Sequence, residues 1–114
     1  MTKAIATAQP VDRLRGFHAH HLVARRFSHL IGVHEDDIIA VALSPRLHNN
    51  VGGMGVHIDS LINNVLRRIG AVRHQETLGQ VWIAHREVYH DIGYPEWADA
   101  IYDAYFSKRG VPYS

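Results

Sequence analysis

The chain contains no cysteine, which excludes disulfide bridges and every metal site that depends on thiolate ligands. It has no apolar run that approaches the roughly 18 residues required for a membrane-spanning helix. Residues 1–10 lack the apolar core of a signal peptide. We therefore expect no contact with membranes, and any metal would be held by histidine, aspartate, glutamate or asparagine.

At 114 residues the chain is long enough for one domain with a modest core. We interpret residues 1–16 as a lead-in and residues 17–114 as a single domain. The net charge of +1 hides an asymmetry: residues 1–73 carry nine Lys/Arg against five Asp/Glu, whereas residues 74–114 carry three against six. A basic front half suits a polyanionic partner, although an ordinary mixed surface explains the same counts equally well.

Histidine is the residue that the chain has in excess, with ten of them scattered over residues 18–90. Three fall within residues 18–21 and are flanked by apolar residues. Adjacent side chains leave the backbone in different directions, so one histidine of a pair can bind a metal while the other faces a substrate. We take His20 and His21 as this pair and interpret His18 as structural. Two buried, hydrogen-bonded core histidines are the alternative interpretation.

The front half of the chain predicts one short helix and one strand. Apolar residues within 22–31 fit a short amphipathic helix that stops at Gly32. The polar residues 34–37 predict a turn, and the apolar, β-branched run 38–43 predicts a buried strand. Serine and proline at the next two positions then predict a helix that runs to about residue 50, ended by a glycine-rich segment.

The second half predicts three amphipathic helices. Apolar residues recur with the helical period over residues 58–69 and 78–92, and glycine follows each segment. A third helix begins at Pro95. We assign to the core the residues on the apolar faces of these helices, namely Trp82, His85, Tyr89, Trp97 and Tyr105. The expected fold class is α+β, with a small strand-and-helix front half that is backed by three amphipathic helices.

The order of the front-half elements and two short motifs resemble the HNH or endonuclease VII-type nucleases, also called ββα-metal or His-Me finger nucleases. The motifs are Ala19-His20-His21 and, after the strand, Pro45-Arg46-Leu47-His48. The first is similar to the mark of Ala-His-His toxin domains of bacterial polymorphic and Rhs-type systems, and the second to nuclease colicins. The resemblance implies a small ββα-metal core formed by the His-His segment, the strand and the following helix.

The resemblance also implies a role for each motif residue. His20 would be a metal ligand, and His21 would be the general base that deprotonates the attacking water. His48, at the start of the helix, would be a second metal ligand. Asp37, just before the strand, stands where this family often has the residue that orients the base. Such orientation requires a hydrogen bond to the second nitrogen of the imidazole.

The chain departs from the colicin pattern at the third metal ligand. Four residues after His48, where colicin-type sites have another histidine, it has Gly52. His57 is the next candidate, with Asn50 and Asp59 nearby, and water is the alternative ligand.

The chemistry expected of such a site is phosphodiester hydrolysis. The charge that develops on the phosphoryl and leaving oxygens can be stabilised by one divalent ion, here Mg²⁺, Zn²⁺, Ni²⁺ or Mn²⁺. An imidazole with a pKa near 6.5 can accept a proton close to neutral pH. Arg25, Arg26 and Arg46 are candidate contacts to substrate phosphates, although each also fits an ordinary solvated surface.

We therefore expect a metal-dependent endonuclease toxin with DNA as its substrate. The resemblance further implies the C-terminal part of a larger secreted effector that acts in the cytoplasm of a target cell and is neutralised by a cognate immunity protein. Two alternatives stay open. One is a metal-dependent RNase on the same scaffold, and the other is a non-catalytic module that binds nucleic acid or protein and uses its histidines structurally.

Overall fold

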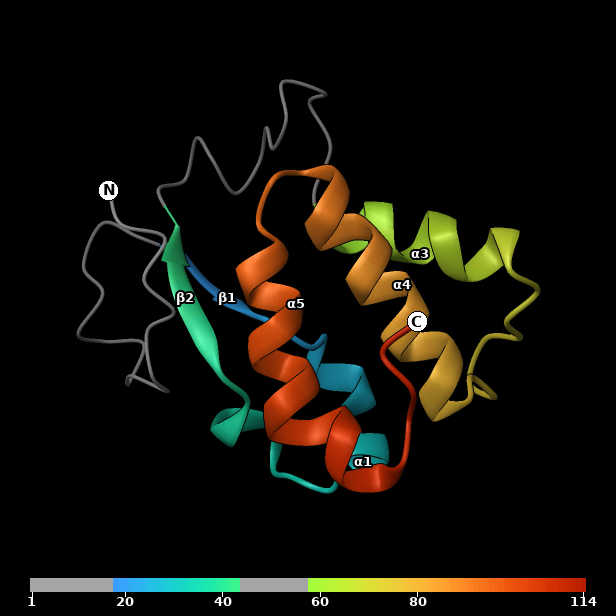
Figure 1. Cartoon of the computed structure of the whole chain (residues 1–114), viewed down its shortest axis with the longest axis horizontal. Coiled ribbons are helices and arrows are strands. Elements are labelled where there is room, and N and C mark those ends of the chain that lie inside the picture. The colour runs from blue at the N-terminus through green and yellow to red at the C-terminus, as the bar shows by residue number, and fades with distance from the viewer. Residues whose placement is uncertain (1–17, 44–57) are drawn as a thin grey trace.

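The computed structural model describes residues 18–43 and 58–114. The predicted lead-in and the helix predicted over residues 45–50 lie outside these segments. The described segments contain strands β1 (His18–His21) and β2 (Ala40–Leu43) and helices α1 (Ser28–Ile31), α3 (Ile58–Arg68), α4 (Leu78–Asp91) and α5 (Pro95–Ile101). Three 3-10 turns and one π-helical turn complete them: Arg25–Phe27, Glu35–Asp37, Ser107–Arg109 and Tyr102–Phe106. The expected α+β class is confirmed (Figure 1).

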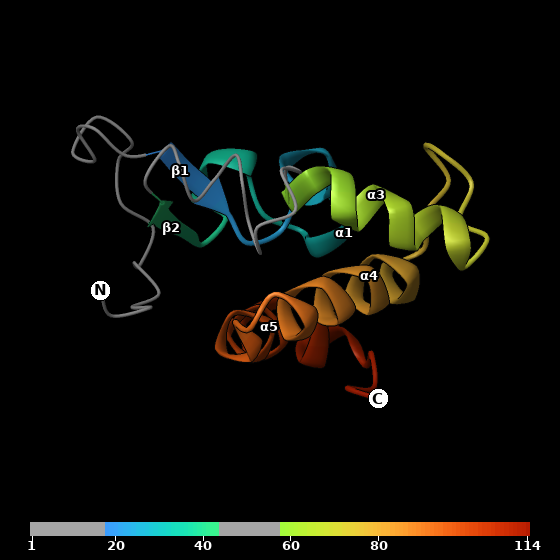
Figure 2. The same cartoon turned by 90° about the horizontal axis from the view of Figure 1, so that it is seen from above.

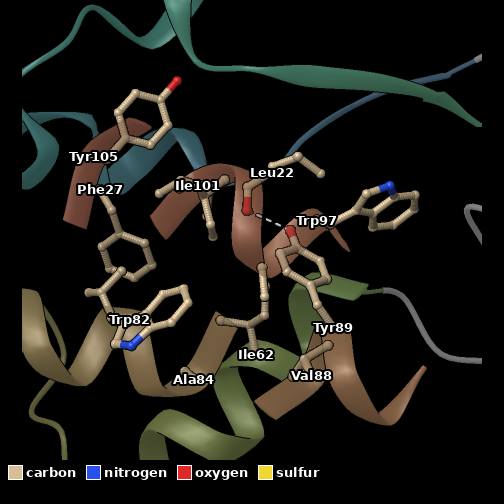
Figure 3. Close-up of a cluster of buried hydrophobic side chains, with 14 of the residues drawn as sticks. Leu22, Phe27, Ile62, Trp82, Ala84, Val88, Tyr89, Trp97, Ile101 and Tyr105 are labelled. Atoms are coloured by element: carbon tan, nitrogen blue, oxygen red, sulfur yellow. Dashed lines mark hydrogen bonds between the residues drawn. The ribbon is translucent and has the colours of Figure 1, made fainter. Parts of the chain in front are cut away.

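These elements form two layers. Figure 2 shows β1, β2, α1 and α3 in one layer, and α4 and α5 in the other. The core fills the space between them, where Leu22 and Phe27 of the first layer meet Trp82 and Tyr89 of the second (Figure 3). Burial of a side chain such as Leu22 or Phe27 contributes roughly 1.5 to 3 kcal/mol to folding. None of the helices in the described segments is long and apolar enough to cross a membrane.

The two strands form an antiparallel sheet whose register determines where the histidine pair points. His20 pairs with Val41, and His21 pairs with Ala40. Successive side chains of a strand point to opposite faces of the sheet. His20 is therefore directed into the core, where it is buried, and His21 is directed to the other face, where it is partly exposed.

The helix predicted over residues 22–31 was wrong at its beginning. It starts only at Ser28, after a bend at residues 22–23 and a 3-10 turn over residues 25–27. The reason is a contact that is distant in sequence: the backbone N–H of Leu22 donates to the carbonyl of Ile39 at 2.8 Å, which continues the pairing of the two strands. The apolar side chains that suggested a helix still pack into the core, where Leu22, Val23, Phe27 and Ile31 are buried and Leu30 is partly buried.

The remaining front-half predictions agree with the structure. The first helix ends at Gly32, whose φ of 71° is the left-handed conformation that glycine adopts without strain. The polar residues 34–37 form a turn, in which the imidazole of His34 accepts a hydrogen bond from the backbone N–H of Asp36 at 3.1 Å. The predicted strand over residues 38–43 is confirmed as β2, which begins at Ala40.

Helices α3, α4 and α5 confirm the three helices predicted in the second half. Gly70 and Gly93 follow α3 and α4 as expected. A capping box in which Thr77 and Gln80 exchange side-chain to backbone hydrogen bonds starts α4, and Pro95 occupies the first turn of α5. The residues assigned to the core are all buried: Trp82, His85, Tyr89, Trp97 and Tyr105.

The C-terminal residues pack against the helical layer. The carbonyl of Tyr113 accepts hydrogen bonds from Trp82 Nε1 at 3.0 Å and from Arg86 at 2.6 Å. Its hydroxyl donates to Asp99 at 2.6 Å, and its ring packs edge-on against Trp82. This segment therefore covers one side of α4 and α5.

Candidate functional site

His20 lies in an aromatic cage beneath the sheet. Only 4% of its surface is exposed, and its ring centroid is 6.1 Å from those of Tyr89 and Trp97. Its Nε2 lies 3.0 Å from the hydroxyl oxygen of Tyr89. That hydroxyl donates in turn to the carbonyl oxygen of Leu22 at 2.5 Å, the bond drawn in Figure 3. Two consecutive hydrogen bonds therefore connect the His20 imidazole through Tyr89 to the backbone of Leu22, the residue after β1.

His21 occupies a different environment, on the other face of the sheet. Burial lowers the pKa of its imidazole below the usual value, and the guanidinium of Arg25 lowers it further. The carboxylates of Asp36, Glu35 and Asp59 act in the opposite direction. The net effect favours the neutral imidazole at neutral pH, and this is the form that can accept a proton.

Asp59 is brought to this region by the first turn of α3. Its carboxylate acts electrostatically on His21 and also on two core groups of α4, His85 and Tyr89. The sequence indicated Asp59 only as a residue near His57. Its proximity to the histidine pair depends on how α3 packs against the first layer, which no local pattern encodes.

Asp37, the residue predicted to orient His21, lies in the 3-10 turn before β2 and is exposed. The carboxylate of Asp37 acts electrostatically on Tyr105: burial raises the pKa of that hydroxyl, and Asp37 adds to the increase. The carboxylates that act on His21 include its neighbours Asp36 and Glu35. The orienting role of Asp37 stays a prediction.

The two described candidates for phosphate binding differ in how their charge is used. Arg25 donates to Asp36 at 2.9 Å and lies 3.7 Å from Glu35, so two carboxylates neutralise it. Arg26 donates to the neutral amide oxygen of Asn63 at 2.5 Å, and its guanidinium stacks over the Phe27 ring at 4.5 Å. The positive charge of Arg25 is thus balanced by neighbouring carboxylates, whereas the described polar partner of Arg26 is neutral.

The predicted metal ligands are only partly described. His20 lies in the described segments, whereas His48 and His57 lie outside them, as does Arg46 among the phosphate candidates. Within residues 18–43 and 58–114 no group of three histidine, aspartate or glutamate side chains is arranged to hold a metal ion. A metal on His20 would therefore need ligands from the rest of the chain, to which the predicted ligands His48 and His57 belong.

His85 is confirmed as a core histidine. Its Nδ1 is 2.7 Å from the carbonyl of Val81, and its Nε2 accepts the backbone N–H of Ala24 at 3.3 Å. Burial lowers the pKa of this imidazole to about 4. Both nitrogens serve backbone groups, so His85 has a structural role.

Two features of this region could not be recognised in the sequence. Tyr89 was assigned to the core from its helical spacing, and nothing in that spacing indicates that its hydroxyl meets His20. Trp97 is buried beside His20 and stacks on Tyr94 at 4.1 Å. In the described part of the chain its Nε1 has no hydrogen-bond partner.

Comparison with known proteins adds no family: no protein-family model, no curated protein and no solved structure matches the chain. The relation to His-Me finger nucleases therefore stays a resemblance of motifs. The function has to be argued from the geometry of the histidine pair.

Proposed function

We propose that this chain is a metal-dependent endonuclease built on a ββα-type core, in which His20 binds the metal and His21 is the general base. The observation that carries the proposal is the division of the two adjacent histidines by the β1–β2 register. His20 is buried and hydrogen-bonded, whereas His21 is partly exposed among charged groups. A ligand needs a fixed orientation, and a base needs access to water, so each environment suits its role.

In the proposed reaction His21 accepts the proton of the attacking water. A neutral imidazole can take a proton from water, and the lowered pKa of His21 favours this neutral form at neutral pH. The carboxylates of Asp36, Glu35 and Asp59 raise that pKa, and they stabilise the imidazolium that forms when the proton arrives. Such a positioned base contributes on the order of 100- to 10,000-fold to a rate.

His20, together with His48 and His57, would hold the divalent ion. When bound, a divalent ion supplies charge stabilisation for the phosphoryl and leaving oxygens. The contribution of the described chain is the rigid support of His20, because Tyr89 and Trp97 enclose its ring. The contact between its Nε2 and the Tyr89 hydroxyl adds a polar restraint on one edge of the ring.

The proposed substrate is DNA, and its phosphates would contact arginines that no carboxylate neutralises. Within residues 18–43 and 58–114, Arg26 and Arg67 meet this condition, since Arg26 donates to the amide of Asn63 and Arg67 to the amide of Asn64. Arg68, by contrast, forms an ion pair with Glu87. Arg26 and Arg67 are therefore the preferred described contacts, with Arg46 as a further candidate from the motif. The proposal includes delivery as part of a larger effector and inhibition by an immunity protein.

The direct test is cleavage of supercoiled plasmid and of structured RNA by the purified full chain with Mg²⁺, Mn²⁺, Ni²⁺ or Zn²⁺. We expect cleavage of the plasmid and its loss in His21→Ala. His29→Ala, which alters an exposed histidine of α1, is the matched control and should cut like wild type. Cleavage of RNA alone would assign the RNase alternative. Intact plasmid and RNA with every ion, together with no metal uptake, would favour the non-catalytic module.

A further inference from the structure

The hydrogen bonds of the Tyr89 hydroxyl indicate which ring nitrogen of His20 carries a proton. A tyrosine hydroxyl has one proton to donate, whereas a carbonyl oxygen can only accept. The hydroxyl oxygen of Tyr89 lies 2.5 Å from the carbonyl oxygen of Leu22, so its proton is used there. The contact of 3.0 Å between the same hydroxyl and Nε2 of His20 is a hydrogen bond only if Nε2 supplies the proton. In neutral His20, the in-plane lone pair therefore belongs to Nδ1.

We infer that Tyr89 is a positioning residue that fixes His20 as the Nε2–H tautomer and thereby directs Nδ1, and not Nε2, to the metal. The part that concerns the metal rests on the proposed function, whereas the tautomer follows from the geometry of the chain itself. Tyr89 contacts neither substrate nor metal in this account, because it acts through His20.

The scaffold prevents Tyr89 from reversing its hydrogen bonds. Leu22 is fixed by the bond from its own N–H to Ile39, so its carbonyl presents a constant acceptor. Tyr89 is fully buried in α4, where its ring also meets Trp97 edge-on at 5.6 Å. His20 must adapt to Tyr89, and not the reverse.

This assignment has a consequence for the site. Nδ1 is one bond nearer to the Cβ atom of histidine than Nε2, so a metal on Nδ1 lies closer to the backbone of β1. A second-shell hydrogen bond to the other ring nitrogen also makes the ligating nitrogen more basic, and loss of such a partner typically costs 10- to 100-fold in metal affinity. Tyr89 would therefore set both the place and the strength of metal binding.

The experiment uses the full chain with ¹⁵N-labelled histidine. Long-range proton–nitrogen spectra of the metal-free protein above neutral pH report which nitrogen of His20 carries the proton. Zn²⁺ and Ni²⁺ titrations report affinity. The test variant Tyr89→Phe keeps the ring and removes the hydroxyl. Tyr105→Phe is the matched control, because Tyr105 is also buried and its hydroxyl accepts a hydrogen bond at 2.9 Å from the N–H of Ile39 and not from His20.

We expect wild type and Tyr105→Phe to show protonated Nε2 on His20 and equal metal affinity. Tyr89→Phe should lose the uniform tautomer and bind metal roughly 10- to 100-fold more weakly. A proton on Nδ1 of wild-type His20 would overturn the inference even if Tyr89→Phe failed to fold. An unchanged tautomer in folded Tyr89→Phe would overturn it as well. If wild type shows the Nε2–H tautomer but binds no metal, the tautomer assignment stands, and the metal role fails together with the proposed function.

Discussion

The backbone N–H of Ala24 donates a hydrogen bond to Nε2 of His85, a residue 61 positions later in the chain. Ala24 lies between β1 and the 3-10 turn Arg25–Phe27, and His85 belongs to α4. Because Nδ1 of the same imidazole bonds to the carbonyl of Val81 within α4, His85 joins the two layers of the fold through its neutral form. Because Ala24 follows His21 by only three residues, this hydrogen bond attaches the segment directly after β1 to α4.

The stability of the protein should fall as the pH decreases through the range between the two pKa values of His85. The unfolded imidazole titrates near 6.5 and the folded one near 4, so the unfolded state binds the extra proton between these values. The contribution of neutral His85 to the free energy of unfolding is fully present above pH 6.5 and is lost progressively toward pH 4. The total is about 3 kcal/mol.

Urea unfolding at several pH values in this range checks the prediction. His85→Gln serves as the comparison, since it removes the titrating group and retains a donor and an acceptor. We expect a shallower pH dependence in the variant. Equal losses in both proteins between about pH 6.5 and about pH 5 would show that His85 is not the source.

Binding of DNA should depend on Arg26 and Arg67 more than on Arg25 and Arg68. Among the described residues, the first two donate to the neutral amides of asparagines, whereas carboxylates pair with the other two. Each lost phosphate contact reduces the slope of log K against log salt by about 0.9. In a His21→Ala background that does not cut, the double variant Arg26→Ala, Arg67→Ala should lower the slope by roughly 2.

Fluorescence anisotropy with duplex DNA at a series of salt concentrations measures this slope. The matched control is Arg25→Ala with Arg68→Ala, which removes the same formal charge. We expect the control to change the slope much less. Equal slopes for both double variants would mean that the neighbouring carboxylates do not select the phosphate contacts.

Replacement of Tyr113 should destabilise the whole domain, although it lies one residue from the end of the sequence. Its ring packs against Trp82 and Tyr102, and its hydroxyl bonds to Asp99. Tyr113→Ala removes these contacts, and we expect a loss of about 1 to 3 kcal/mol. Thermal unfolding measures the effect, with Ser114→Ala, at an exposed neighbour, as the control. A melting temperature unchanged by Tyr113→Ala would show that this segment does not contribute to stability.

The sequence predicted best the elements whose signals are local. Apolar residues at the helical period and a glycine after the last turn define α3 and α4, and both helices form where the pattern places them. The pattern failed at Leu22, where a hydrogen bond to Ile39 draws the chain into the sheet. That contact spans the α1 region, so no window of neighbouring residues reveals it.

The candidate site shows the same limit. The adjacency of His20 and His21 in the Ala-His-His motif was sufficient to predict that their side chains point in different directions, and the register of β1 with β2 places them on opposite faces of the sheet. The partners of these histidines were not predicted, because Tyr89 meets His20 across 69 positions and Asp59 reaches His21 through the packing of α3. The helical spacing of a tyrosine such as Tyr89 predicts that it is buried, but it does not predict which polar group its hydroxyl contacts.

The most direct test of the central claim compares His20→Ala and His21→Ala in two measurements on the same samples, metal affinity by calorimetry and the rate of plasmid cleavage. If the histidines divide ligand and base between them, His20→Ala should lose metal binding and cleavage together. His21→Ala should bind metal with nearly wild-type affinity while its cleavage rate falls on the order of 100- to 10,000-fold. The account would be contradicted if His21→Ala cut as fast as wild type, or if the two variants lost metal binding to the same extent.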